Sequence, residues 1–301
     1  MELKLEEDGK KPATPAAPAK PAAAAKPAQS KLYQPAVALQ FFKTAGKVES
    51  IAQGKPIFVE NEGGANLYSE GARMYLLLDG QVALSVRKKP VGGVRKGEIF
   101  GELAPISQFP RTATAVAATA CKVISVNEKQ FQDGIAKSPD FAIMLMSIII
   151  NRLRETIAKL TSGGALSEQD PWNKATMFDR KLLADLQREF EDKPPALHPL
   201  NKVIMKEGDR GIFMYAVLDG TVAVSIGGKL VEMVGPGGVF GEMALIDQNA
   251  RVATATAESD CTLLAINRND FLNMIRTKPA FALSLLKALS ERLRFMTSKV
   301  K

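Results

Sequence analysis

The strongest constraint on this chain is a segment that occurs twice at a fixed distance. Residues 97–115 read GEIFGELAPISQFPRTATA, and residues 237–255 read GGVFGEMALIDQNARVATA. The triplet Phe-Gly-Glu and the later Arg-x-Ala-Thr are both displaced by 140 positions, and in each copy nine positions separate Glu from Arg. A long repeat of this kind predicts two domains of one type in tandem.

Each copy has the features of an anion-binding site. Gly101 and Gly241 can adopt backbone angles closed to other residues, and they let a ligand approach the main chain. A helical turn after the glycine would aim unpaired N–H groups and a positive dipole end at an anion, and Pro105 is tolerated in such a turn. Arg111 and Arg251 add a full positive charge in a fork that matches phosphate oxygens.

The glutamate after each glycine cannot bind a phosphate itself. A carboxylate accepts hydrogen bonds, so Glu102 and Glu242 suit a sugar hydroxyl beside the phosphate, or they orient the arginine. The alternative is a structural ion pair of Glu102 with Arg111, and of Glu242 with Arg251, in domains without a ligand. Buried ion pairs are poor stabilisers, which favours the ligand site over this alternative.

The pattern Phe-Gly-Glu-(Leu/Met)-Ala followed by Arg-x-Ala-Thr resembles the phosphate-binding cassette of cyclic nucleotide-binding domains. Such domains occur in the catabolite activator proteins, the cAMP- and cGMP-dependent protein kinases and cyclic nucleotide-gated channels. The resemblance covers nearly all of residues 41–301 and implies cAMP or cGMP as the ligand. It assigns binding to Gly101, Glu102, Leu103, Ala104, Arg111, Thr112 and Ala113, and to Gly241, Glu242, Met243, Ala244, Arg251, Val252 and Ala253.

The resemblance also bears on the base of the nucleotide. Thr112 follows the arginine, as in the cGMP-dependent kinases, where a threonine touches the guanine amino group; bacterial cAMP-binding members also accommodate a hydroxyl there. Val252 offers only its backbone N–H, so the two sites are expected to differ in affinity or selectivity. Family members usually cap the base from the helix after the barrel. Arg154, Arg294 and Phe295 are the capping candidates, and a solvated arginine is the alternative.

Many short apolar runs separated by turns predict an antiparallel barrel or jelly roll in each repeat. The expected fold class is α+β, mainly β, with flanking helices. Asp-Gly at 79–80 and at 219–220 stands between two apolar runs and predicts a hairpin in each repeat. We expect helices at 36–44, 131–136, 174–191 and 271–276, and strands at 55–60, 74–78, 81–86, 113–118, 121–126, 214–218 and 221–224.

The domain boundaries follow from composition. Residues 1–31 form a tail rich in Lys, Pro and Ala that cannot bury a core and is expected to be disordered. The first domain is placed at 32–161, a linker with paired glycines at 162–171, and the second domain at 172–301. A difference in repeat spacing puts about six extra residues into a surface loop at 64–70 of the first repeat.

A long amphipathic helix is expected after each barrel. Its apolar residues recur at intervals of three and four, which is a helical spacing. Such a stripe can face the core, act as a mobile lid over the ligand, or pair two chains in a homodimer. The two stripes are Leu145, Ile149, Leu153, Ile157 and Leu160, and Leu285, Leu289, Leu293, Met296 and Val300.

Composition narrows the class of protein. A net charge of +8 would permit acidic partners, but it is spread along the chain without a basic stripe. Cys121 and Cys261 occupy matching positions in apolar runs, so we expect free, buried thiols and a reducing cytoplasm. We expect no signal peptide and no membrane span. With His198 as the single histidine, neither a metal cluster nor an enzymatic triad can be assembled, and no cofactor is expected.

These observations favour a cyclic nucleotide sensor that acts on a protein partner and is not an enzyme. Its tandem layout resembles regulatory subunits of cAMP-dependent kinase, but the tail holds no arginine for a basic inhibitor segment. One alternative is an interaction scaffold that keeps the fold without a nucleotide. Another is a sensor of a different ligand, such as a cyclic dinucleotide. DNA binding is not expected, since the chain shows no recognition helix.

Overall fold

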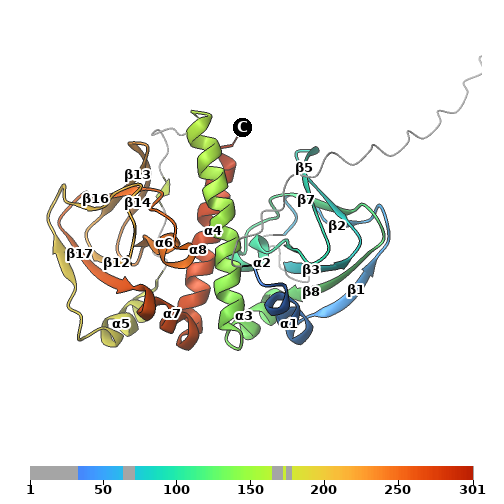
Figure 1. The fold of residues 1–301 in the computed structure, drawn as a ribbon, viewed down its shortest axis with the longest axis horizontal. Helices are drawn as coiled ribbons and strands as arrows, with labels where there is room; N and C mark the ends of the chain where they lie inside the picture. Colours follow the sequence, from blue (N-terminus) through green and yellow to red (C-terminus); the bar gives the residue numbers. More distant parts are fainter. Residues whose placement is uncertain (1–32, 64–71, 165–171, 174–177, 301) are drawn as a thin grey trace, which may run out of the picture.

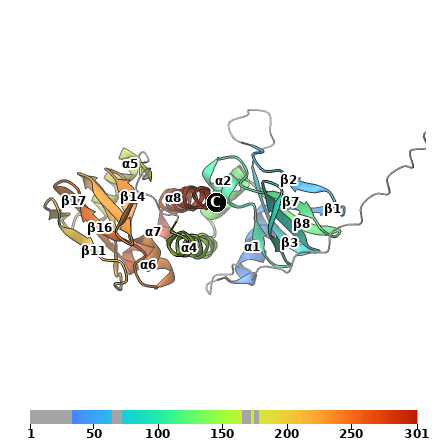
Figure 2. The same ribbon diagram turned by 90° about the horizontal axis from the view of Figure 1, so that it is seen from above.

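Two β-domains lie on opposite sides of a pair of long helices (Figure 1). The computed structural model describes residues 33–63, 72–164, 172–173 and 178–300. The long helices are α4 (Pro139–Ser162) and α8 (Pro279–Ser298), and both views show them side by side between the domains (Figures 1 and 2). About 38% of the described residues are helical and 31% are in strands, so the predicted α+β class with two tandem β-domains is confirmed.

The two domains repeat the same order of elements. The first contains α1 (Pro35–Ala45), β1 (Lys47–Ile51), β2 (Pro56–Phe58), β3 (Arg73–Asp79), β4 (Val82–Val86), β5 (Lys89–Val94), β6 (Ile99–Phe100), α2 (Leu103–Ser107), β7 (Thr114–Ala117), β8 (Cys121–Asn127), α3 (Glu128–Ile135) and α4. The second contains β9 (Trp172–Asn173), α5 (Arg180–Glu189), β10 (Ala196–His198), β11 (Val203–Met205), β12 (Phe213–Asp219), β13 (Val222–Ile226), β14 (Lys229–Val234), β15 (Val239–Phe240), α6 (Glu242–Asp247), β16 (Thr254–Ala257), β17 (Cys261–Asn267), α7 (Arg268–Thr277) and α8.

Each domain is built from two facing sheets. Their strand orders are β1-β8-β3-β6 and β2-β7-β4-β5 in the first domain, and β10-β17-β12-β15 and β11-β16-β13-β14-β9 in the second. The pairs are antiparallel except for β14 with β9. Both β4–β5 and β13–β14 carry an irregularity at the same place, after Leu84 and after Val224. The repeat in sequence is therefore a repeat in structure down to single bulges.

The predicted Asp-Gly hairpins are wrong. Strands β3 and β4 lie in different sheets, as do β12 and β13, so each Asp-Gly turn carries the chain from one sheet to the other. Gly80 has a φ of +92°, and a Cβ there would lie 2.4 Å from the carbonyl oxygen of Ala120. The hairpins are β4–β5 and β13–β14, which turn through residues of positive φ at 87–88 and 227–228, as a type I′ turn requires.

The long helices bury their apolar stripes against each other within one chain. Leu145, Ile149 and Leu153 of α4 are buried, and so are Leu285 and Leu289 of α8. The stripes therefore take the core-facing role that the spacing allowed, and pairing of two chains through the long helices stays a prediction. Helix α4 also packs on α6 of the second domain, and α8 packs on α2 of the first.

The other predicted elements agree with the structure in place but not always in length. In the range expected to be one helix, 174–191, helix α5 begins at Arg180, where the side chain of Asp179 caps it by accepting a hydrogen bond from the Leu182 N–H, and residues 174–177 lie outside the described residues. The strands that were not predicted are β1, β5, β6, β9, β10, β11, β14, β15, β16 and β17. Cys121 and Cys261 are free and buried, as expected. The tail at 1–31, the extra loop at 64–70 and most of the predicted linker lie outside the described residues.

Candidate functional site

The first cassette turns sharply at Gly101 and then enters helix α2. Gly101 has a φ of +70°, and a Cβ at this position would lie 3.0 Å from Nη1 of Arg111 and 2.9 Å from the ring of Phe58. The glycine is therefore needed both for the backbone conformation and for the close approach of the arginine. Pro105 lies in the first turn of α2, where the missing N–H costs no intrahelical hydrogen bond.

Arg111 is a buried cation at the wall of the first barrel. Its Nη1 donates to the carbonyl oxygen of Gly101 at 2.8 Å, and its guanidinium lies 4.2 Å from the ring centre of Phe58. Burial lowers the pKa of Arg111, against the opposing charges of Tyr75, Glu62 and Glu102. A buried arginine whose charge is only partly compensated by its surroundings is a suitable binding group for an anion.

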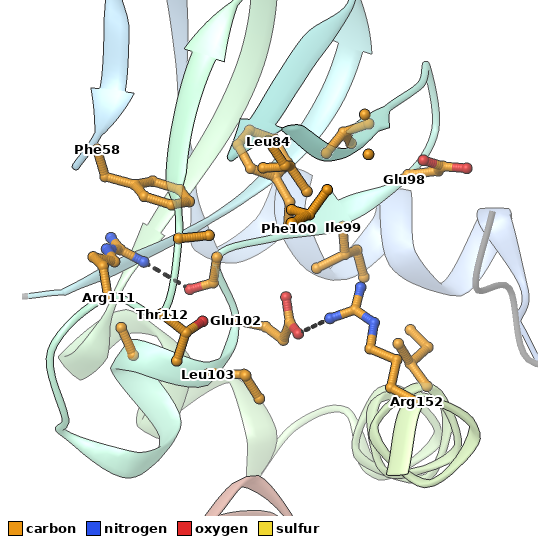
Figure 3. A pocket seen from close by; sticks show the side chains of 18 of the residues that line it. Phe58, Leu84, Glu98, Ile99, Phe100, Glu102, Leu103, Arg111, Thr112 and Arg152 are labelled. Carbon is orange, nitrogen blue, oxygen red and sulfur yellow. Dashed lines mark hydrogen bonds and ion pairs between the residues drawn. The ribbon is translucent and has the colours of Figure 1, made fainter. Parts of the chain in front are cut away.

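The structural alternative required an ion pair between Glu102 and Arg111, and these two side chains do not form one. Its carboxylate accepts a hydrogen bond from Nη1 of Arg152, which comes from α4 (Figure 3). Figure 3 shows Arg111 beside Phe58 and Arg152 reaching the glutamate from the helix on the other side. The cassette glutamate thereby connects the barrel with the long helix, a link that the spacing of the cassette alone did not reveal.

A cavity of about 260 Å³ lies in front of this arrangement. All seven residues that the sequence assigns to the first site line it, and so do Arg152, Gly92 and Tyr33. The hydroxyl of Tyr33 donates to the carbonyl oxygen of Gly97, and burial, followed by the charge of Glu98, raises the pKa of Tyr33 to about 12. An adjoining groove of about 240 Å³ continues from Thr112 and Arg152 to α8.

The second cassette repeats the backbone of the first. Gly241 has a φ of +82°, and its carbonyl oxygen accepts a hydrogen bond of 2.6 Å from Nη1 of Arg251. A second hydrogen bond joins Nη2 of Arg251 to the carbonyl oxygen of Phe213. Gly211 makes room for this side chain, since a Cβ there would lie 2.2 Å from the guanidinium carbon. Burial lowers the pKa of Arg251.

The second site differs in what faces its glutamate. Arg292 of α8 donates to Glu242 at 2.7 Å, and it also forms two hydrogen bonds, of 3.0 and 2.9 Å, to Glu232 of β14. All three side chains are buried. Burial alone would lower the pKa of Arg292, but the charges and hydrogen bonds of the two carboxylates outweigh it and raise that pKa. The remaining cavity measures about 70 Å³, and the seven predicted residues of the second site line it.

The base-capping candidates lie differently from the expectation. Arg154 extends from α4 to the second domain, where it forms an ion pair with Asp247 and donates to the carbonyl oxygen of Ala250. Arg294 extends from α8 to the first domain, where it donates to the carbonyl oxygen of Pro110 at 2.8 Å. Each arginine therefore reaches the cassette of the other repeat and not its own. Phe295 remains beside its own site and lines the second cavity.

Sequence reasoning missed Arg152, Arg292, Glu232 and Tyr33. A signal was present for the first two, since residues 151–155 read NRLRE and residues 291–295 read ERLRF, which places both arginines at matching positions of the repeat. At the same spacing of 140 residues, Gly92 of the first repeat matches Glu232 of the second, so this difference was also visible in the sequence. Nothing in the sequence placed Tyr33 at the first cavity.

Among the residues that the structure describes, no three His, Cys, Asp or Glu side chains are grouped closely enough to hold a metal ion. In the same part of the chain, no helix is long and apolar enough to cross a membrane.

Comparison with known families identifies the fold of these sites. The model of the cyclic nucleotide-binding domain matches residues 50–138 and again residues 198–278, which together make up more than half of the chain. The chain belongs to the cyclic nucleotide-binding domain family. Both matched ranges include a complete cassette, so the two copies found in the sequence correspond to two family domains.

The curated relatives extend well beyond the region that they share with this chain. A cGMP-dependent protein kinase of Toxoplasma gondii is 27% identical over 77% of this chain and 20% of its own length. The cyclic AMP receptor protein of Thermus thermophilus is 41% identical over 33% of this chain and 48% of its own length. The chain thus spans between a fifth and about half of these relatives. Among solved structures, the regulatory subunit of a cAMP-independent protein kinase A from Trypanosoma brucei is 19% identical, covers 88% of this chain and 93% of its own, and gives a TM-score of 0.32.

Proposed function

We propose that this protein is a cyclic nucleotide sensor, in which cAMP or cGMP binds in one or both barrels and the long helices transmit the signal to a protein partner. The observation that carries the proposal is the arrangement at the first cassette. A buried arginine and a buried glutamate share one wall of a cavity of about 260 Å³, and Arg152 on the long helix pairs with that glutamate. The protein acts by binding, not by catalysis.

The ligand would use the cassette in a defined orientation. Its phosphate meets Arg111 and the backbone N–H groups at the start of α2, while a sugar hydroxyl donates to Glu102. The base lies toward Thr112 and the groove between α4 and α8, where Arg294 is the arginine available to stack on it. This orientation moves the capping role proposed for Arg294 from the second site to the first.

The ion pair between Glu102 and Arg152 offers a route for the signal. A hydroxyl that binds Glu102 changes the electrostatic partner of an arginine that belongs to α4. Ligand can shift the position of the helix only by binding one arrangement more tightly than the other. The protein partner would then recognise the altered surface around the helix pair. Free, buried cysteines suit a reducing compartment, which supports a cytoplasmic location for the sensor.

The proposal is tested by calorimetric titration of the protein with cAMP, cGMP and cyclic di-GMP. We expect Arg111→Ala to weaken nucleotide binding by about 1.5–3 kcal/mol, which is roughly 10- to 150-fold, because a charge-assisted contact to phosphate is lost. Arg95→Ala is the matched control, since this arginine of the same domain is exposed and does not line the cavity.

A nucleotide that binds only the folded protein must also stabilise it, by about 2.7 kcal/mol at a hundred times its dissociation constant. A thermal melt with and without nucleotide is therefore an independent readout. Absence of both heat and thermal shift with all three ligands would leave the interaction scaffold as the function of the fold. A response to cyclic di-GMP alone would keep the sensor and change its ligand.

A further inference from the structure

We infer that the first barrel alone is open to a nucleotide, and that the second is held closed by its own Arg292, which Glu232 positions inside the site. This inference rests on the proposed function, because it assigns that function to one of the two cassettes. It follows from a comparison of the two sites position by position, since 140 residues separate each matching pair from Arg73 and Phe213 onward.

The two matching arginines of the long helices are held very differently. Arg152 makes one ion pair, to Glu102, and 31% of its side chain is exposed beside the first cavity. Arg292 is bound on two sides, by Glu232 and by Glu242, and only 8% of its side chain is exposed. Its Nη2 also donates to the carbonyl oxygen of Val239. Arg292 therefore occupies the space in front of its cassette glutamate, whereas Arg152 stands at the edge.

A single position accounts for the extra partner. Gly92 of β5 matches Glu232 of β14, and both line their cavities. A Cβ added at Gly92 would meet no atom within 4 Å, so this part of the first site is open space. In the second site the same space is used by a carboxylate that binds Arg292 through both oxygens. Glu232 is not one of the residues predicted to bind the nucleotide. It acts through Arg292, which it holds in place, and is therefore a positioning residue.

The cavity sizes agree with this difference. Sites for small ligands usually measure about 300 Å³ or more, and the first cavity, at about 260 Å³, approaches that range and continues into the adjoining groove. The second cavity has about 70 Å³, which is room for about two water molecules. A nucleotide cannot enter the second site unless side chains first move out of it.

The helices add an apolar cover to the second site. Leu153 and Ile157 of α4 reach across the helix pair and line the second cavity together with residues of α8. The groove next to the first site has polar residues where the second site has apolar ones. Phe295, Met296 and Ile157 at the second site match Glu155, Thr156 and Thr297 at the first, in that order.

The closed form persists because opening it is costly. Moving Arg292 out of the site would leave two buried carboxylates without their shared cation. A binding-competent form that is rarely populated weakens the apparent affinity in proportion, so an open fraction of about 1% weakens it about 100-fold. The first site faces no such barrier, because Gly92 provides no second carboxylate.

Calorimetric titration with cAMP and with cGMP counts the sites. For the wild-type chain we expect one binding event, which Arg111→Ala weakens roughly 10- to 150-fold and Arg251→Ala leaves unchanged. Glu232→Ala should gain a second event, because Arg292 is then held by Glu242 in the way that Arg152 is held by Glu102. Combining Glu232→Ala with Arg251→Ala should remove that second event again.

Glu258→Ala is the control, since it removes an exposed carboxylate of the same domain and should leave one event. Glu232→Gln, which keeps the shape of the side chain, replaces the alanine variant if a thermal melt shows that alanine prevents folding. Two events in the wild-type chain, one lost with each arginine, would overturn the inference and leave the proposed function standing. One event in folded Glu232 variants would overturn the role of Glu232. No event in any variant would overturn the proposed function and this inference with it.

Discussion

Removing the arginine from each long helix tests how differently the two sites are built. Arg292→Met leaves Glu232 and Glu242 buried without their cation, and breaking a buried ion pair from one side costs about 3–5 kcal/mol. Arg152→Met leaves Glu102 at the wall of a cavity of about 260 Å³ that admits water. Although Glu102 is itself buried, its carboxylate can be hydrated from this cavity and Arg152 is 31% exposed, so the loss should be nearer the value of an exposed pair, about 1 kcal/mol.

Differential scanning calorimetry measures this contrast. In a domain of this size a change of 1 kcal/mol moves the melting temperature by about 4 °C. We expect Arg292→Met to lower the transition of the second domain by about 12–20 °C, and Arg152→Met to lower that of the first by about 4 °C. The double variant with Glu232→Gln should recover part of the loss, because one of the two orphaned charges is then removed.

The loss should also depend on pH in a defined direction. Burial, aided by the charge of Glu242, already raises the pKa of Glu232 against the opposing effect of Arg292, so removal of the arginine must raise it further. A carboxyl group with a raised folded-state pKa stabilises the fold when protonated, and that contribution is lost as the pH rises. The Arg292→Met variant should therefore lose more stability at about pH 8 than at about pH 5. Equal losses for the two arginine variants, or a loss independent of pH, would refute this account of the second site.

Further predictions concern single contacts. Gly241→Ala should destabilise the chain by about 1–3 kcal/mol in a urea titration, since it combines a φ of +82° with a Cβ 2.6 Å from the arginine of its cassette. Leu289→Ala should cost about 2–5 kcal/mol in the same titration, because this residue is fully buried between the long helices. Arg154→Ala should increase hydrogen exchange in α6, which loses its ion pair to α4. Burial, followed by the charge of Lys202, lowers the pKa of His198, so stability should fall as the pH drops below about 6.5, and less so in His198→Gln.

The cassettes could be read from the sequence because their chemistry is local. A glycine of positive φ, a short helix and an arginine nine positions later lie within one stretch, and the structure brings Gly101 and Arg111 into contact as that stretch implies. The repeat supplied the second copy at the same spacing. Fold class followed for the same reason, since alternating short strands and turns are also local signals.

The partners of the cassettes could not be read in this way. Fifty positions separate Glu102 from Arg152, and only the packing of α4 against the barrel brings them together. The Asp-Gly turns were assigned to hairpins because a turn signal does not say whether the next strand returns to the same sheet. Tertiary packing also decides what each long helix packs against. An apolar stripe alone fits a core contact, a lid or a homodimer equally well, and in the structure α4 packs against α8.

The spacing of the arginines explains how each long helix contacts both cassettes. Residues two positions apart on an α-helix point about 200° apart, so Arg152 and Arg154 face opposite sides of α4. One reaches the first cassette and the other the second, and Arg292 and Arg294 repeat the arrangement on α8 with the order of the domains reversed. A ligand that displaces α4 at the first site must therefore strain the contact of Arg154 with the second cassette. Coupling between two sites is reciprocal. The second domain, although closed to nucleotide, therefore influences the affinity of the first site for nucleotide, because it binds Arg154 on the opposite side of α4. A fluorescent probe on α6 should therefore respond to nucleotide in the wild-type chain and lose that response in Arg154→Ala, although the nucleotide binds at the first site and not at α6.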